Sequence, residues 1–207
     1  MRSDAAELVI VVALISLTLV GLILPKLGRV KGGPGPPSCT GNLRQLGTAF
    51  ALWEDDHNGL RPMSVPAAEG GAMEAALRGD LVRMFQCISN ELSTPAVVLC
   101  PEEGRTRATN FATLSVENLS YFLSESGDTN RPDRWLVGDH RMLIDGAAAK
   151  GGLVGMSRTN RFRWAKGIHH GLGNVLFSDR SVRPLKDESL NAYQEGLRTN
   201  VERLLFP

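Results

Sequence analysis

The chain has 207 residues, a length typical of one or two domains. Lys and Arg total 23 against 22 Asp and Glu, and the resulting formal charge of +1 argues against a partner held by overall charge, such as a nucleic acid or another polyanion. The hydrophobic fraction of 43% excludes wholesale disorder, and three cysteines are too few for a disulfide scaffold or a four-cysteine zinc site.

Near the N-terminus, residues 8–24 form an apolar run of seventeen positions without a charge. A helix of this length spans about 26 Å, close to the bilayer core of about 30 Å. The run therefore predicts a membrane-spanning helix within an N-terminal segment at 1–27. A buried core helix and a cleaved secretory signal are the alternatives. Against the signal, only one basic side chain, Arg2, precedes the run.

A linker is predicted at 28–38, because its stretch 31–37 holds three prolines and three glycines. The globular domain is expected over 39–207 and opens with an amphipathic helix. Ser38 or Thr40 can cap the start of this helix, and Asn58-Gly59 supplies a left-handed stop. The apolar residues at helical spacing are Leu43, Leu46, Phe50 and Trp53.

The rest of the domain is predicted to consist of short helices and strands. Helical character is predicted at 72–88. Short apolar segments predict antiparallel strands at 119–124, 135–137, 142–144 and 174–177, with a hairpin turn at 178–181. A closing helix is predicted from Asp187, with apolar spacing at Leu190, Tyr193, Leu197, Val201 and Leu204. The predicted fold class is α+β: a transmembrane helix, an amphipathic helix packed on a small antiparallel sheet, and a C-terminal helix.

Glu7 opens the apolar run that reaches Pro25, and this segment resembles the start of type IV pilin-like proteins and type II secretion pseudopilins. Three later patterns occur in the order found in a large bacterial group of such proteins. They are Cys39-x-x-Asn-Leu, Cys100-Pro and His169-x-Gly-x-x-Asn-Val-Leu-Phe-x-Asp, in which the residue after His169 is His170.

The resemblance implies a pilin-like α+β fold and a structural subunit of a type IV pilus-like or type II secretion pseudopilus assembly. Its implied partners are like subunits, an inner-membrane assembly platform and membrane lipid. The implied location is the inner membrane, single-pass, with a periplasmic or extracellular domain. Lys26, Arg29 and Lys31 follow the run, however, and the positive-inside tendency would place the domain in the cytoplasm.

In such assemblies the residue that corresponds to Glu7 pairs with the N-terminal amine of a neighbouring subunit and sets the register. A carboxylate near the centre of a bilayer costs about 3 kcal/mol, so Glu7 should lie at the membrane edge or be paired. The alternative is an interfacial acid that only marks the end of the helix. Arg2 stands where these families carry the glycine before the peptidase cleavage site, so cleavage is not predicted.

The resemblance also bears on the cysteines and on the hairpin. Cys39 and Cys100 occupy matching positions and could form a disulfide around a loop of about sixty residues, worth roughly 4 kcal/mol. Cys87 would then be the free thiol, and three reduced cysteines are the alternative. The family turn Asp-Gly is replaced by Asp179-Arg180. Arginine at positive φ loses about 1 kcal/mol relative to glycine, so a longer or different turn is predicted.

Two further readings remain. A metal or acid–base site could draw on His140, His169, His170, Asp139, Asp145 and Asp179. The sequence holds no H-E-x-x-H, G-x-S-x-G or P-loop motif, so no enzyme activity, cofactor or metal is predicted. Instead, His169, His170 and Asp179 are expected to order the loop before the hairpin or to bind a cation weakly.

The stretch 161–166 interleaves basic and aromatic residues, as single-strand nucleic-acid platforms do. A strand with one solvated basic face explains it equally well, so a nucleic-acid partner is not predicted. The alternative to the assembly hypothesis is a non-polymerising single-pass envelope protein with a ligand-binding or enzymatic pilin-like domain. Replacing Glu7 by Ala distinguishes the two, because only a polymerising subunit needs that carboxylate for incorporation.

Overall fold

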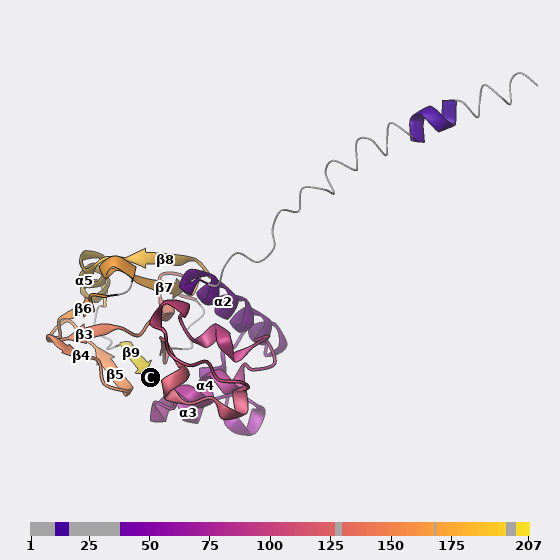
Figure 1. Cartoon of the computed structure of the whole chain (residues 1–207). Helices are drawn as coiled ribbons and strands as arrows, with labels where there is room; N and C mark the ends of the chain where they lie inside the picture. The colour runs from indigo at the N-terminus through magenta and orange to yellow at the C-terminus, as the bar shows by residue number, and fades with distance from the viewer. Residues whose placement is uncertain (1–10, 17–37, 127–129, 168, 198–201) are drawn as a thin grey trace, which may run out of the picture. The chain divides into compact units, whose positions relative to one another are not determined.

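A computed structural model describes residues 11–16, 38–126, 130–167, 169–197 and 202–207 (Figure 1). By its contacts the chain forms two units, Met1–Pro36 and Pro37–Pro207. The second unit contains the sheets and nearly all of the helices in the described ranges. It is an α+β domain with antiparallel sheets.

The predicted membrane-spanning helix is corrected by the structure. Over the ranges just given, none of the helices has both the length and the apolar character needed to cross a bilayer. Of the apolar run, only 11–16 is described, a helical stretch about 9 Å long. The inner-membrane, single-pass localisation depends on a spanning helix and is corrected on the same finding.

The first helix of the domain, α2 (Cys39–Asp56), begins and ends where the sequence predicts. The Ser38 side chain accepts a hydrogen bond of 3.0 Å from the Gly41 N–H and so caps the helix start. Asn58 and Gly59 follow the helix with φ of 56° and 77°. The residues on its buried face include Leu43, Leu46, Phe50 and Trp53.

The single helical region predicted at 72–88 is divided into α3 (Met73–Arg78) and α4 (Leu81–Cys87). Gly79 lies between them with φ of 74°, and a Cβ there would come within 2.8 Å of the Leu153 backbone nitrogen. The chain therefore turns where only glycine fits. Short 3₁₀ turns supply the rest of this region: η1 (Pro62–Ser64), η2 (Ala67–Glu69), η3 (Pro95–Val98), η4 (Pro101–Glu103), η5 (Phe111–Thr113) and η6 (Val116–Asn118).

Two antiparallel sheets complete the domain. The larger has six strands in the order β5-β9-β1-β2-β7-β8, and the smaller has three in the order β4-β3-β6. Strands β1 and β3 lie within two of the four predicted segments, whereas β2 and β7 cover the other two and extend beyond them by two residues and by one. The strand bounds are β1 (Tyr121–Ser124), β2 (Trp135–Asp139), β3 (Met142–Ile144), β4 (Ala147–Ala148), β5 (Gly152–Met156), β6 (Phe162–Trp164), β7 (Gly173–Phe177), β8 (Val182–Leu185) and β9 (Glu202–Phe206).

The predicted closing helix is wrong in its second half. Helix α5 (Asp187–Gly196) forms as expected, but the chain ends in β9, which pairs with β1 on one side and β5 on the other. Leu204, Leu205 and Phe206 are consecutive and all buried. An apolar run of this kind suits a strand with both faces covered, whereas one helix face would bury only part of it.

The hairpin turn between β7 and β8 lies at the predicted residues 178–181, but Arg180 adopts the positive φ that the predicted longer or different turn would avoid. The Arg180 N–H donates to the Phe177 carbonyl and the Phe177 N–H donates to the Ser181 carbonyl, each at 2.9 Å, and Arg180 has φ of 67°. This is a three-residue loop whose last residue is left-handed. The Asp179 carboxylate accepts bonds from the Ser181 N–H at 2.9 Å and from Arg183 at 2.7 Å, which helps to hold the tight turn.

Two apolar clusters cover the two faces of the larger sheet. Side chains alternate along β1. Tyr121 and Leu123 belong to the cluster that includes side chains of α2, α3 and α4, whereas Phe122 belongs to the cluster that includes side chains of β3, β6 and α5. At Gly47 the helix α2 lies close to the sheet, since a Cβ there would lie 3.1 Å from Leu176 of β7. The sheet is therefore buried on both sides.

Candidate functional site

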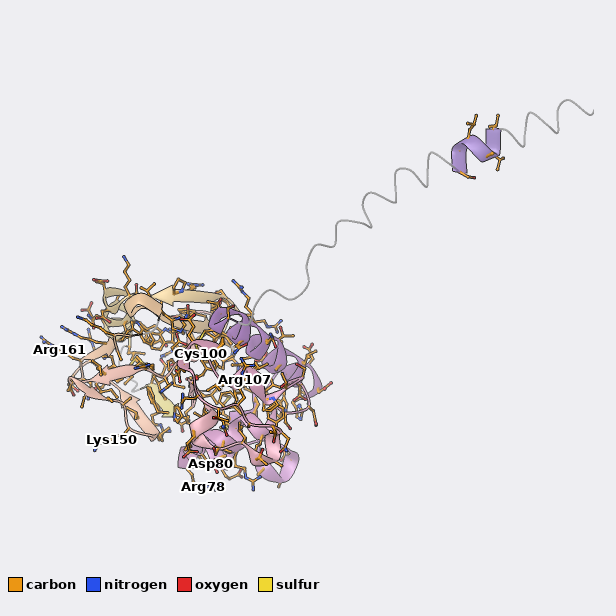
Figure 2. The ribbon with its side chains drawn as sticks, in the orientation of Figure 1. Arg78, Asp80, Cys100, Arg107, Lys150 and Arg161 are labelled. Atoms are coloured by element: carbon orange, nitrogen blue, oxygen red, sulfur yellow. A yellow bond between two sulfur atoms is a disulfide. The ribbon has the colours of Figure 1, made fainter. Side chains whose placement is uncertain are left out.

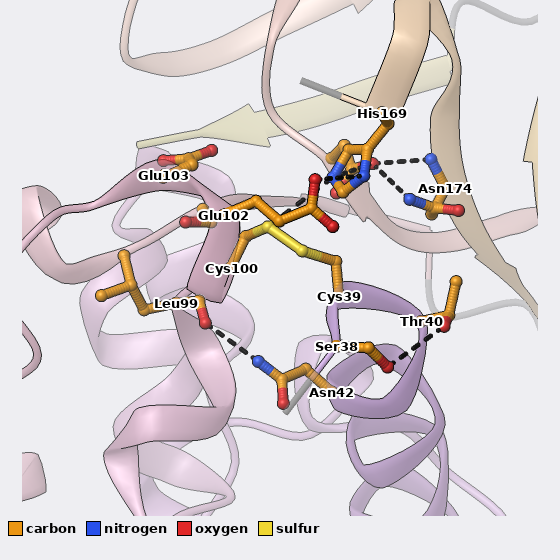
Figure 3. The surroundings of a disulfide bond; sticks show 12 residues. Ser38, Cys39, Thr40, Asn42, Leu99, Cys100, Glu102, Glu103, His169 and Asn174 are labelled. Carbon is orange, nitrogen blue, oxygen red and sulfur yellow. Dashed lines mark hydrogen bonds and ion pairs between the residues drawn. A yellow bond between two sulfur atoms is a disulfide. The ribbon is translucent and has the colours of Figure 1, made fainter. Parts of the chain in front are cut away.

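A disulfide joins Cys39, the first residue of α2, to Cys100, which lies between η3 and η4 (Figure 3). The two Cα atoms are 5.0 Å apart across a sequence separation of 61, and the residues are 2% and 0% exposed. This is the pairing that the resemblance implies. Cys87 carries the free thiol.

A buried hydrogen bond runs beside the disulfide. Asn42, one helical turn into α2, donates from Nδ2 to the Leu99 carbonyl at 2.9 Å (Figure 3). Because a buried carbonyl without a partner is unfavourable, this bond helps to fix the chain just before Cys100 against the helix. The start of α2 is thus attached to the segment 99–100 by one covalent and one polar contact.

The imidazole of His169 lies over the disulfide, as Figure 3 shows. Its Nε2 is 3.6 Å from the Cys100 Sγ and 3.5 Å from the Asp139 Oδ2, and its Nδ1 is 3.4 Å from the Glu102 Oε2. His169 opens η7 (His169–Gly171) with a left-handed φ of 53°. The ring therefore lies between a sulfur and two carboxylates that come from different elements.

Asp139, the last residue of β2, is the most deeply placed acid of this group, at 2% exposed. Its Oδ2 accepts hydrogen bonds from Asn174, at 2.7 Å from the backbone N–H and at 3.0 Å from Nδ2. Its Oδ1 is buried and has no hydrogen-bond partner in the described part of the chain. Burial raises the pKa of Asp139 to about 6, against the opposing effects of the Asn174 N–H and of His169.

His140, the neighbour of Asp139 in sequence, belongs to a second polar group. Its Nδ1 is 2.9 Å from the Ser120 carbonyl and 3.3 Å from the Glu103 Oε1. Arg105 in turn pairs with Glu103. Burial lowers the pKa of His140, while Glu103 opposes that shift. The adjacent residues 139 and 140 therefore have separate partners, as alternation along a strand requires.

The other residues singled out in the sequence lie elsewhere or outside the described residues. Asp179 is held in the hairpin turn by Ser181 and Arg183. Asp145 accepts a hydrogen bond of 2.8 Å from the Arg161 N–H, at a turn where it has φ of 51°. Glu7 and the side chain of His170 lie outside the described residues.

The basic and aromatic stretch forms part of β6. Phe162 and Trp164 are buried and Arg163 between them is exposed, the alternation of a strand with one solvated face. Figure 2 shows Arg161 at the periphery of the domain, well away from Cys100. The stretch is therefore separate from the group around the disulfide.

Sequence reasoning missed three members of the group around the disulfide: Glu102 and Asn174 as partners, and Asp139 as the residue that His169 faces. Asn174 lies inside the quoted pattern that starts at His169, five residues after it, and Glu102 directly follows the quoted Cys100-Pro. Those patterns were the available signal, but they carry no information about which elements meet.

Comparison of the chain with protein-family models, curated proteins and solved structures finds no match.

Proposed function

We propose that this chain is a structural subunit of a pilus-like or pseudopilus-like assembly and acts by packing against copies of itself rather than by catalysis. The observation that carries the proposal is the exposed apolar surface of the helical stretch 11–16, where Val11 and Val12 are 51% and 55% exposed. Contiguous exposed apolar surface marks an interaction site. In the sequence this stretch is part of a longer charge-free apolar run at 8–24.

The construction of the domain supports the same role. The chain enters the domain at Ser38, and the next residue, Cys39, is bonded to Cys100. The residue that follows the linker, Cys39, is therefore joined to the folded domain both by the backbone of α2 and by the disulfide to Cys100. A subunit held in an assembly by its N-terminal segment benefits from this attachment, because strain on the linker reaches a cross-linked domain rather than the free end of a helix.

The polar group around the disulfide supports a positioning role over a catalytic one. The side chains of His169 and Asp139 are only 9% and 3% exposed. Their contacts are with Cys100, Glu102 and Asn174. These contacts join η4, β2, η7 and β7 at the start of α2, so the group orders the domain where the N-terminal segment enters it.

A photo-cross-linking experiment tests the proposal. The full chain carries Val12→Cys in a Cys87→Ser background, with the native disulfide intact, and the new thiol bears a benzophenone. Irradiation should give covalent species of twice the chain mass of 22.4 kDa or more. Mass spectrometry should locate the linkage in the apolar run of a second copy. A probe at Thr48→Cys, on the exposed face of α2, is the matched control and should give little product.

Glu7→Ala in the Val12→Cys chain separates ordered assembly from simple aggregation. A carboxylate among apolar side chains requires a charged partner, and the resemblance implies the N-terminal amine of the neighbouring copy. Removing the carboxylate should abolish the cross-link, whereas aggregation driven by apolar contact would persist. Equal cross-linking with and without Glu7, or none in either chain, contradicts the proposal and favours a protein that does not polymerise.

A further inference from the structure

The group around the disulfide contains the side-chain types of a tetrahedral metal site, with its two sulfurs bonded to each other in the oxidised chain. One ligand atom each from Cys39, Cys100 and His169 lies within 4.8 Å of the others. In tetrahedral zinc coordination, a thiolate sulfur and an imidazole nitrogen are about 3.6 Å apart, and an imidazole nitrogen and a carboxylate oxygen about 3.4 Å. The His169 Nε2 lies 3.6 Å from the Cys100 Sγ and 3.5 Å from the Asp139 Oδ2.

The surroundings have the features of an outer coordination shell. Ligating histidines almost always direct their second ring nitrogen to a carboxylate, carbonyl or water, and the His169 Nδ1 lies 3.4 Å from the Glu102 Oε2. Asn174 holds Asp139 by two hydrogen bonds, which orients the carboxylate. The Asp139 Oδ1 is buried without a hydrogen-bond partner in the ranges that the structure describes, and coordination to a bound cation would compensate its negative charge.

We propose that reduction of the Cys39–Cys100 disulfide converts this group into a binding site for Zn²⁺ or a similar divalent transition metal, with Cys39, Cys100, His169 and Asp139 as its four ligands. A phosphine performs the reduction: two electrons break the S–S bond, the phosphine is oxidised to its oxide with oxygen from water, and two thiols form. Metal binding then releases the two thiol protons to solvent.

The metal and the disulfide exclude each other, because a disulfide offers no thiolate to the metal. The set of two sulfurs, one nitrogen and one oxygen suits Zn²⁺ and Co²⁺ rather than Mg²⁺ or Ca²⁺, which prefer oxygen ligands. Three protein ligands of the N and S type with one carboxylate also complete a four-coordinate shell without an outside group. The site is therefore a closed, structural one.

Cobalt spectroscopy on the full chain tests the proposal. Co²⁺ is added to protein kept under a phosphine, and absorption is recorded together with circular dichroism. Tetrahedral Co²⁺ with thiolate ligands gives intense visible bands and a sulfur-to-metal charge-transfer band in the near ultraviolet. The reduced chain should show both at one equivalent of Co²⁺, and Zn²⁺ should displace them. The oxidised chain should show neither.

Two variants test whether His169 is a ligand and whether Cys87 is not. His169→Gln, first shown to fold in the oxidised state, should weaken Co²⁺ binding by at least tenfold. Cys87→Ser removes the thiol outside the site and should leave the spectrum unchanged. The proposal is overturned if the reduced chain gives no thiolate spectrum, whether or not it keeps its fold. It is equally overturned if His169→Gln binds as tightly as the parent, or if Cys87→Ser abolishes the bands.

Discussion

Arg180 occupies a backbone conformation that glycine adopts more readily. Its φ of 67° lies in the left-handed region, and its side chain is exposed and forms a long ion pair of 3.8 Å with Glu54. Arg180→Gly should therefore stabilise the domain by about 1 kcal/mol, measured by urea unfolding. Arg180→Ala removes the same side chain but keeps a Cβ at positive φ, so it should give no gain. A gain with alanine equal to that with glycine would contradict the backbone explanation.

Cys87 is predicted to be an unreactive thiol. Burial raises its pKa from 9.0 to about 11, and Glu91 adds to the shift. Because the thiolate is the nucleophile, alkylation at pH 8 should be roughly a hundredfold slower than for an unperturbed cysteine. The rate should rise about tenfold per pH unit up to about pH 11. Iodoacetamide labelling of the oxidised chain, with Cys87→Ser as the blank, measures this. A rate that levels off near pH 9 would contradict the burial effect.

At the scale of elements, the close contact of α2 with β7 depends on Gly47. A Cβ at this position would lie 3.1 Å from the Leu176 Cδ1, and Leu176 is fully buried. Gly47→Leu should separate the helix from the sheet and destabilise the domain by about 1–3 kcal/mol. Thr48→Leu adds a similar side chain on the exposed face of the same helix and should change stability by less than about 0.5 kcal/mol. Equal losses of unfolding free energy for the two variants in urea would contradict the role of Gly47.

Local signals in the sequence determine some elements and leave others open. Ser38, the spacing of the apolar residues and Asn58-Gly59 suffice to place α2, because each acts through nearby backbone. The strand β9 could not be distinguished from a helical continuation, since Leu197, Val201 and Leu204 keep helical spacing. Its identity is decided by pairing with β1 and β5, which lie 46 or more residues earlier in the chain.

The candidate site was predictable to a similar degree. The quoted patterns point to Cys39, Cys100 and His169, and the structure brings all three together. The patterns do not specify that Asp139 approaches from β2, because strand pairing places it there and single-sequence reasoning does not reach such contacts. Asp179, expected near His169, is instead held by its own turn.

At the scale of the whole molecule, the disulfide closes a loop across a sequence separation of 61. Cross-linking over this distance lowers the entropy of the unfolded chain, a contribution of about 4 kcal/mol in the chain-entropy model. The double variant Cys39→Ala/Cys100→Ala should lose about that much in the free energy of unfolding. Cys87→Ser is the control and should lose less than about 1 kcal/mol. A double-variant loss below about 1 kcal/mol would show that the disulfide does not constrain the unfolded state as supposed.

The proposed role in assembly also belongs to the scale of the whole molecule, because the proposal requires the N-terminal run and the cross-linked domain to act as one subunit. The most direct measurement is the mass distribution of the full chain after amine-reactive cross-linking. A structural subunit should give a ladder in multiples of 22.4 kDa that extends beyond the dimer, and the Glu7→Ala chain should lose the ladder. A single species of 22.4 kDa, or the same ladder without the Glu7 carboxylate, would contradict the proposed function.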